Sequence, residues 1–182
     1  MIKVYKHNPE FKPEAPFMSD EAMVEMFDGR PILNVDILFI DRKAKCVLLP
    51  KRIAKPAEGL WFVGGMVKRS MPPLDMAVKI VLSETGTVID PEQLEYVNAS
   101  WFEWDYRKDA PSENGRVDFN LCYAYEPTGA EIESISNKLT DKEYDTTHGL
   151  KPYSRAELIL ALKGESACKQ AIVDYFDQLF PS

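Results

Sequence analysis

Apolar residues recur at helical spacing in the middle of the chain. This spacing predicts a helix that begins at Pro72-Pro73 and ends at Gly86. Proline is tolerated in the first helical turn, where its missing N–H would be unpaired anyway, and glycine is a favourable C-terminal cap. The residues predicted to face a core are Leu74, Ala77, Val78, Val81 and Leu82.

Three further helices are predicted from capping residues and periodicity. Ser19 can cap a short helix that runs through Phe27. Ser154 begins a helix over residues 155–162, with Glu157 at the capping-box position. Residues 167–180 repeat apolar side chains at helical spacing, which predicts a final amphipathic helix.

Runs of β-branched and aromatic residues predict strands between these helices. The strand over 61–63 runs into Gly64-Gly65, where the absence of a Cβ lets the backbone pass close to another group. Strands 31–40 and 46–50 are expected to form a hairpin, and strands 96–106 and 117–125 an antiparallel pair.

Two segments are predicted to lack regular structure. Residues 1–20 contain several prolines, which predicts an extended N-terminal arm of low order. Residues 127–152 form a long polar stretch, and a loop of this length in a compact domain is usually functional or disordered.

Length, charge and cysteine content limit the classes of function. The 182 residues favour one domain over 1–182, and the net charge of -7 argues against a broad basic groove for nucleic acid. No apolar run is long enough to cross a membrane, and no stretch resembles a signal peptide, so we expect a cytoplasmic enzyme. Cys46, Cys122 and Cys168 are far apart and odd in number, which favours neither a disulfide framework nor a zinc site.

Three charged residues stand out from this pattern. Asp36 interrupts an apolar strand, so its carboxylate must be paired, lie at an edge or face a cleft. Glu84 lies in the last turn of the central helix, where the helix dipole disfavours a carboxylate, and it is either solvated or held for a metal or substrate. Arg52 follows Lys51 at the end of a strand, a place where two cations are usually solvated.

The stretch from residue 60 to 87, LWFVGGMVKRSMPPLDMAVKIVLSETGT, resembles a Nudix box. The usual pattern is G-x5-E-x7-R-E-U-x-E-E-x-G-U, where U is an aliphatic residue. With Gly65 as the first glycine, Glu84 and Gly86 match the pattern. The positions that depart from it are Met71, Lys79, Ile80, Ser83 and Thr87.

A more specific resemblance is to one branch, the GDP-mannose mannosyl hydrolases, which keep one glutamate before x-Gly. This branch carries a run like LLxKRxxxPAxGxWFV ahead of its glycines, and residues 47–63 here read VLLPKRIAKPAEGLWFV. An arginine that normally follows the two glycines is replaced by Met66. The resemblance implies an α/β (α+β) protein of the Nudix fold, with a mixed β-sheet between helices and residues 60–87 as a loop-helix-loop.

The resemblance also implies a Mg²⁺ site and a substrate site. Mg²⁺ would be bound by Glu84, by a main-chain carbonyl of the Gly64-Gly65 pair and by Glu143 from the late loop. Arg52 would reach the diphosphate of the substrate, and Asp36 would stabilise positive charge that develops at the anomeric carbon of the sugar.

The same resemblance gives two candidates for the remaining roles. Tyr123, which ends the run Asp118-Phe119-Asn120-Leu121-Cys122-Tyr123, would contact the substrate. The general base of the branch is a histidine in an acidic run, and direct alignment places Tyr144 there, a poor base with an unperturbed pKa of about 10. A small shift aligns His148 instead; we expect His148 to be the base, and the alternative is a solvated loop histidine.

These features favour a Mg²⁺-dependent hydrolase of a nucleoside-diphosphate sugar such as GDP-mannose or GDP-glucose. Water would attack the anomeric carbon and release nucleoside diphosphate and sugar. Two alternatives stay open: a catalytically silent Nudix fold that binds a nucleotide or a partner protein, and a phosphoanhydride hydrolase with a non-standard carboxylate set. We expect a small-molecule substrate, no nucleic acid and no membrane as partners, with the N-terminal and final helices available for a homodimer.

Overall fold

A computed structural model describes residues 18–181 of the chain. The arm expected over residues 1–20 therefore lies outside the described residues, except at its end. There Ser19 caps the first helix as predicted, because its side chain accepts a hydrogen bond from the backbone N–H of Ala22. Among residues 18–181, no helix combines the length and the hydropathy that a membrane span requires.

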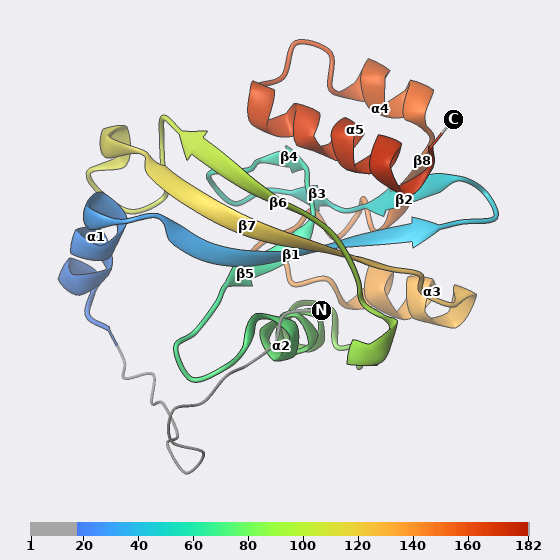
Figure 1. Cartoon of the computed structure of the whole chain (residues 1–182), viewed down its shortest axis with the longest axis horizontal. Coiled ribbons are helices and arrows are strands. Elements are labelled where there is room, and N and C mark those ends of the chain that lie inside the picture. The colour runs from blue at the N-terminus through green and yellow to red at the C-terminus, as the bar shows by residue number, and fades with distance from the viewer. Residues whose placement is uncertain (1–17, 182) are drawn as a thin grey trace.

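A mixed six-stranded sheet forms the centre of the fold (Figure 1). Strands follow the order β6-β7-β1-β2-β8, and β5 pairs with β1 off this path. Only the β1–β7 pair is parallel among these six strands; the other pairs are antiparallel. The strands of the sheet are β1 (Ile32–Asp41), β2 (Cys46–Leu49), β5 (Val63–Met66), β6 (Glu95–Trp104), β7 (Arg116–Tyr125) and β8 (Lys151–Tyr153), and β3 (Lys51–Arg52) and β4 (Gly59–Leu60) form a separate pair.

Helices cover both faces of this sheet, which confirms the predicted arrangement (Figure 1). Helices α4 and α5 lie on one face, and α2 and α3 lie on the other. The helices are α1 (Asp20–Gly29), α2 (Pro73–Thr85), α3 (Gly129–Lys138), α4 (Arg155–Ala161) and α5 (Ala167–Leu179), and two short 3₁₀ turns cover Pro91–Gln93 and Ser112–Asn114.

Strand β1 divides its side chains between two cores. Val35 and Ile37 pack in the cluster that includes α2, whereas Leu38 and Ile40 pack in the cluster that includes α5. Successive side chains of a strand point to opposite faces, so Asp36 shares the α5 face with Leu38 and Ile40. This alternation places the buried carboxylate of Asp36 next to the apolar core that includes α5.

Helix α2 begins and ends as predicted, but its buried face is rotated. Gly86 adopts the left-handed conformation with φ of 63° and its N–H bonds the carbonyl of Leu82, which is the expected C-terminal cap. Leu82 itself is 46% exposed, so its assignment to the core was wrong. The buried residues of α2 are Met76, Ala77, Ile80, Val81 and Thr85.

The predicted strand over 61–63 is displaced along the chain. Trp61 and Phe62 are buried but lie before β5, which contains both Gly64 and Gly65. The two glycines pair with Asp36 and Val35 of β1 and do not form a loop. The close approach inferred from their missing Cβ atoms is therefore an approach to the neighbouring strand.

The stretch 127–152 is not a structureless loop, and this prediction was wrong. It contains α3, whose first turn carries a capping box between Thr128 and Glu131. It also includes the start of β8, which pairs with β2 at the edge of the sheet. The segment between α3 and β8 remains irregular and carries the late-loop candidates Glu143, Tyr144 and His148.

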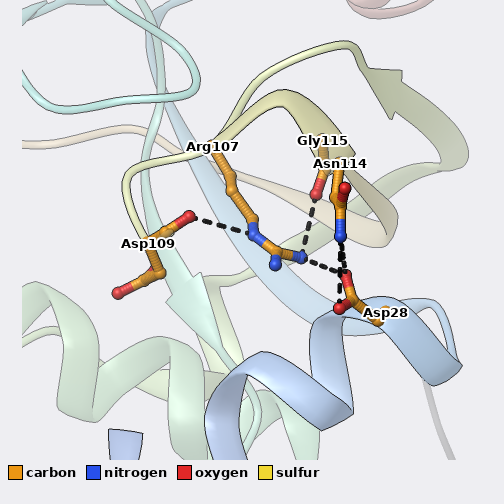
Figure 2. Close-up of polar contacts among 5 residues, drawn as sticks. All are labelled: Asp28, Arg107, Asp109, Asn114 and Gly115. Carbon is orange, nitrogen blue, oxygen red and sulfur yellow. Dashed lines mark hydrogen bonds and ion pairs between the residues drawn. The ribbon is translucent and has the colours of Figure 1, made fainter. Parts of the chain in front are cut away.

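Helix α1 is attached to the β6–β7 connection through Arg107, which is 1% exposed (Figure 2). The guanidinium of Arg107 donates to Asp28 of α1 at 2.7 Å and to the carbonyl oxygens of Asp109 and Gly115. Asn114 donates to the same Asp28 carboxylate. A buried cation is stable only when paired and hydrogen-bonded, so this network fixes α1 beside the connection.

Candidate functional site

A pocket of about 210 Å³ opens beside Asn34 and Asp36 of β1. It combines residues from β1, β3, β5, β6, β7, α2 and the late loop. Five of the seven predicted site residues line it: Asp36, Arg52, Gly64, Glu84 and Glu143. The fold thus brings together residues that are up to 107 positions apart in sequence, from Asp36 to Glu143.

Asp36 is held within the pocket wall by its neighbours. The amide of Asn120 donates to Oδ2 of Asp36 at 2.5 Å, and Asn34 in turn donates to Oδ1 of Asn120 at 3.2 Å. Burial raises the pKa of Asp36 to about 7, against the opposing effect of the Asn120 hydrogen bond, and the Asp118 carboxylate adds to the increase. Gly64 makes room for this carboxylate, because a Cβ at Gly64 would overlap Oδ1 of Asp36.

Arg52 is fixed by main-chain pairing with the late loop. Residues 52 and 144 form an isolated antiparallel bridge, flanked by hydrogen bonds from Ile53 N to Glu143 O and from Asp145 N to Lys51 O, both 2.8 Å.

The side chain of Arg52 keeps a donor for a ligand. Its guanidinium donates to Glu143 Oε2 at 2.8 Å. Within residues 18–181, its Nε is buried and has no hydrogen-bond partner. An unused buried donor is costly, and an acceptor such as a phosphate oxygen would satisfy it.

Glu84 is held from two sides at the end of α2. Its carboxylate accepts a hydrogen bond from the hydroxyl of Tyr144 at 2.5 Å, and its carbonyl accepts one from Thr140 N at 3.0 Å. Burial raises the pKa of Glu84 to about 7, while the Tyr144 hydroxyl and the Arg52 guanidinium oppose the increase. Tyr144 is 2% exposed and burial raises its pKa well above the usual value, so it serves as a donor and is unsuited to act as a base.

The oxygen donors in the pocket suit Mg²⁺ only in part. Glu84 and Glu143 each use one carboxylate oxygen in the hydrogen bonds described above, which leaves the second oxygen of each for a hard cation. Gly64 lines the same pocket, and its carbonyl is the third oxygen that the resemblance implies. Across residues 18–181, however, no three acidic, histidine or cysteine side chains gather into a metal-binding group. The donor set therefore fits an ion that also takes oxygens from a substrate.

Two of the expected site residues lie outside the pocket lining. Tyr123 is 2% exposed and packs in the cluster on the α2 face, beside Tyr96, so it points away from Asp36. Burial raises the pKa of Tyr123. His148 bonds the carbonyl of Gly149 at 2.8 Å and the hydroxyl of Tyr153 at 3.0 Å, and its ring stacks on Tyr153.

The pocket also contains polar residues that sequence reasoning did not single out. Asn34 lies on β1, Asp118 and Asn120 lie on β7, and Arg116 and Trp104 complete this part of the lining. A sequence signal was present, because polar residues alternate in two strands that are otherwise apolar, at 34 and 36 and at 118 and 120.

Asp118 and Arg116 are linked to α1 behind the pocket. Arg116 Nε donates to Asp118 Oδ1 at 2.8 Å, and Trp104 Nε1 donates to Asp118 Oδ2 at 3.0 Å. The guanidinium of Arg116 lies 5.3 Å from the ring centre of Phe27 in α1, a cation–π distance. The anchor formed by Arg107 therefore supports one end of the pocket indirectly.

Comparison with solved structures identifies the fold. A Nudix hydrolase from Nitrosomonas europaea superposes with a TM-score of 0.55 at 12% identity, covering 81% of this chain and 88% of that chain. A MutT Nudix hydrolase from Burkholderia pseudomallei gives 0.56 at 14% identity, covering 83% and 99%. The MutT protein from Methanosarcina mazei Go1 gives 0.55 at 17% identity, covering 82% and 93%.

These similarities confirm the Nudix fold expected from the box-like stretch. No protein-family model matches the sequence, and no curated protein matches it. At such low identities the similarity establishes the arrangement of the backbone, and function must be argued from the site itself.

Proposed function

We propose that this protein is a Nudix-type hydrolase of a nucleoside-diphosphate sugar of the GDP-mannose or GDP-glucose kind. One observation carries the proposal: Asp36, Arg52, Glu84 and Glu143 come from four separate segments and line one pocket. This set contains a guanidinium for the diphosphate, a carboxylate for the sugar and two further carboxylates. The MutT and Nudix hydrolase fold is consistent with such a substrate but does not define it.

In the proposed reaction, water forms a new bond to the anomeric carbon. The bond from that carbon to the diphosphate oxygen breaks, its electron pair leaves with the diphosphate, and the proton that the attacking water loses passes to solvent. Arg52 would donate its free Nε–H to the departing diphosphate, and Asp36 would lie near the positive charge that develops on the sugar. Glu84, Glu143 and Gly64 would hold Mg²⁺ together with the substrate, and the ion would supply neutralisation of the diphosphate charge.

A second candidate is a nucleotide-binding module without turnover. It is favoured by the late loop, where the two candidate bases of the resemblance are otherwise engaged. Tyr144 is buried and donates to Glu84, and His148 is bonded to Tyr153 outside the pocket lining. Met66 also replaces the arginine expected after the two glycines, which removes one cation for phosphate.

The test is an assay of the purified protein with GDP-mannose, GDP-glucose and a panel of other nucleotide sugars, with and without Mg²⁺. Free sugar and nucleoside diphosphate would support the proposal. Sugar phosphate and nucleoside monophosphate would move the attack to phosphorus and establish the phosphoanhydride alternative. Nucleotide binding without any product would establish the binding module.

Two variants sharpen this assay. We expect Glu84→Gln to abolish Mg²⁺-dependent turnover and to weaken Mn²⁺ binding, measured by electron paramagnetic resonance, because it removes the retained box carboxylate. The matched control is Glu133→Gln, which changes an exposed glutamate of α3 away from the pocket. Unchanged turnover in Glu84→Gln would exclude the metal assignment.

A further inference from the structure

Four buried polar side chains face the pocket from two neighbouring strands. Asn34 and Asp36 come from β1, and Asp118 and Asn120 come from β7; each is 3% or 4% exposed. Farther along the same face of the sheet, the side chains are apolar and pack under α5. Burying polar groups costs free energy unless they are hydrogen-bonded, and these four groups find partners only in the wall of the pocket, which makes it the polar end of this face.

The amides of this wall are oriented and retain free hydrogen-bonding capacity. Asn34 Nδ2 donates to Asn120 Oδ1, and Asn120 Nδ2 donates to Asp36 Oδ2. This chain fixes which end of each amide is the donor. Among residues 18–181, the second N–H of each amide and Oδ1 of Asn34 make no other hydrogen bond. The wall thus offers donors and an acceptor side by side.

The pocket also contains apolar ring surface. Trp104 and Trp61 line it, and their rings meet edge to face at 5.6 Å between centroids. The indole N–H of Trp104 is used by Asp118, which fixes the ring. Indole rings supply apolar area for the C–H groups of a ligand, whereas the amides serve its polar groups.

The size and charge of the pocket indicate that it holds only one end of an extended ligand. Its volume of about 210 Å³ lies below the roughly 300–1,000 Å³ of sites that enclose a whole small-molecule ligand. Two carboxyl groups, Asp36 and Asp118, disfavour a phosphate at this wall, and Arg116 is already paired with Asp118. The guanidinium donor that has no partner belongs to Arg52. The part of the ligand at the amide wall is therefore uncharged and rich in hydroxyl groups.

We propose that Asn34, Asn120 and Trp104 form a subsite for the pyranose ring of a nucleotide sugar, with the two asparagines as specificity-determining residues for its hydroxyl groups. This inference rests on the proposed function, and it assigns the sugar end of the ligand to this wall. The nucleoside diphosphate then extends toward Arg52 and out of the pocket.

Binding can be followed through the tryptophans of the pocket. The chain has three tryptophans, and Trp101 is 55% exposed, so a Trp101→Phe background leaves the two that line the pocket. Quenching of their fluorescence is titrated with GDP-mannose and, separately, with GDP, both in the presence of Mg²⁺. Asn34→Ala and Asn120→Ala are compared with Asn98→Ala, which changes an asparagine of β6 outside the pocket lining.

We expect Asn34→Ala and Asn120→Ala to weaken GDP-mannose binding at least tenfold and to change GDP binding less than twofold. Asn98→Ala should change neither. Circular dichroism and the thermal midpoint establish that each variant is folded, and Asn34→Ser serves as a milder substitution if Asn34→Ala does not fold. Removal of one sugar hydroxyl, as in the 2-deoxy analogue of GDP-mannose, weakens binding by some factor. If that hydroxyl contacts the wall, this factor should be smaller for an asparagine variant than for the wild type.

The outcomes separate this inference from the proposed function. If the asparagine variants weaken GDP and GDP-mannose equally, the wall binds the nucleotide or acts structurally, and the subsite is excluded while the proposed function stands. If Asn98→Ala weakens GDP-mannose to the same extent, the effect is also structural. If the wild-type protein binds no nucleotide and no nucleotide sugar, the proposed function fails and the subsite fails with it.

Discussion

The hydroxyl of Tyr144 donates a hydrogen bond to Oε2 of Glu84 at 2.5 Å, joining the late loop to the last turn of α2. Sequence alignment placed Tyr144 where a catalytic histidine stands in the similar branch. The residue is instead a buried donor to the glutamate that the box retains. The Tyr144 hydroxyl therefore holds the Glu84 carboxylate at the end of α2.

Removal of that hydroxyl should cost stability. Tyr144→Phe leaves a buried oxygen of Glu84 without its donor, and we expect the free energy of unfolding to fall by about 1–3 kcal/mol. Urea denaturation measures the change. In a double-mutant cycle with Glu84→Ala, the two effects should not be additive, because each substitution removes the same hydrogen bond. Additive effects would contradict the positioning role.

The two glycines of β5 should respond differently to alanine. A Cβ at Gly64 would lie 2.7 Å from the carbonyl oxygen of Val35 and would also overlap the Asp36 carboxylate. At Gly65 the nearest atom would be Ile80 Cδ1 at 3.4 Å, an ordinary contact. We expect Gly64→Ala to lose several kcal/mol of stability or fail to fold, and Gly65→Ala to change it by about 1 kcal/mol or less. Thermal unfolding of the pair tests this, and equal effects would contradict the close approach of β5 to Asp36.

Replacement of Arg52 by lysine should weaken nucleotide binding while keeping the charge. Lysine lacks the planar fork and the Nε donor that is unpaired in the pocket, so we expect GDP affinity to fall about tenfold or more. Isothermal titration calorimetry provides the measurement. Arg42→Lys is the matched control, since Arg42 forms exposed ion pairs with Glu95 and Glu126 outside this pocket. Full GDP affinity in Arg52→Lys would show that the guanidinium does not bind the diphosphate.

Loss of the Asp28 carboxylate should loosen α1. Asp28→Ala leaves the buried Arg107 guanidinium with carbonyl partners alone, and we expect the free energy of unfolding to fall. Hydrogen exchange read by mass spectrometry should show faster exchange in residues 20–29 and at the β6–β7 connection. Asp20→Ala, at the start of the same helix and outside the Arg107 network, is the control. Unchanged exchange in Asp28→Ala would mean that Phe27 packing holds α1 without the ion pair.

Lys169 gives a prediction about pH. This residue of α5 is 3% exposed, its Nζ donates to the carbonyls of Ala57 and Leu60, and burial lowers its pKa to about 8. The unfolded chain keeps the lysine proton up to about pH 10.4, so the unfolded state binds more protons between pH 8 and that value. Raising the pH through this window should therefore stabilise the wild type relative to Lys169→Met by about 1–3 kcal/mol.

The measurement compares urea denaturation of the two proteins at pH 7 and at pH 9.5. The difference in unfolding free energy between wild type and Lys169→Met should shift toward the wild type at the higher pH. Tyrosine ionisation affects both proteins alike and cancels in this difference. A pH-independent difference would mean that the carbonyl hydrogen bonds keep Lys169 charged in the fold.

Much of the fold could be predicted because local signals agreed with the tertiary structure. Ser19 and Ser154 cap the starts of α1 and α4, and Gly86 caps the end of α2, as predicted. Helix α3 was missed because its surface is polar and its apolar residues are few, although the Thr128 and Glu131 capping box marks its start. The position of the sheet decides which side of α2 is buried and leaves Leu82 exposed. Helical periodicity alone does not give that position.

The sequence predicted those site residues that interrupt an apolar pattern or match a position of the resemblance. Asp36, Arg52, Glu84 and Glu143 meet in one pocket, where their functional roles remain predictions. Tyr123 lies three residues after Asn120, so strand alternation alone places it on the opposite face of β7. The location of His148 depended on its contacts with Tyr153 and Gly149, which no sequence spacing reveals.

The late loop, β3 and the end of α2 are joined by main-chain hydrogen bonds at positions 51, 53, 84, 140, 143 and 145. These bonds do not depend on the side chains that the same positions carry. Evolution could therefore exchange the residues at 52, 84, 143 and 144 one at a time while the backbone kept them adjacent. A scaffold of this kind lets single substitutions change the side chains that meet in the pocket while the arrangement of the backbone stays the same.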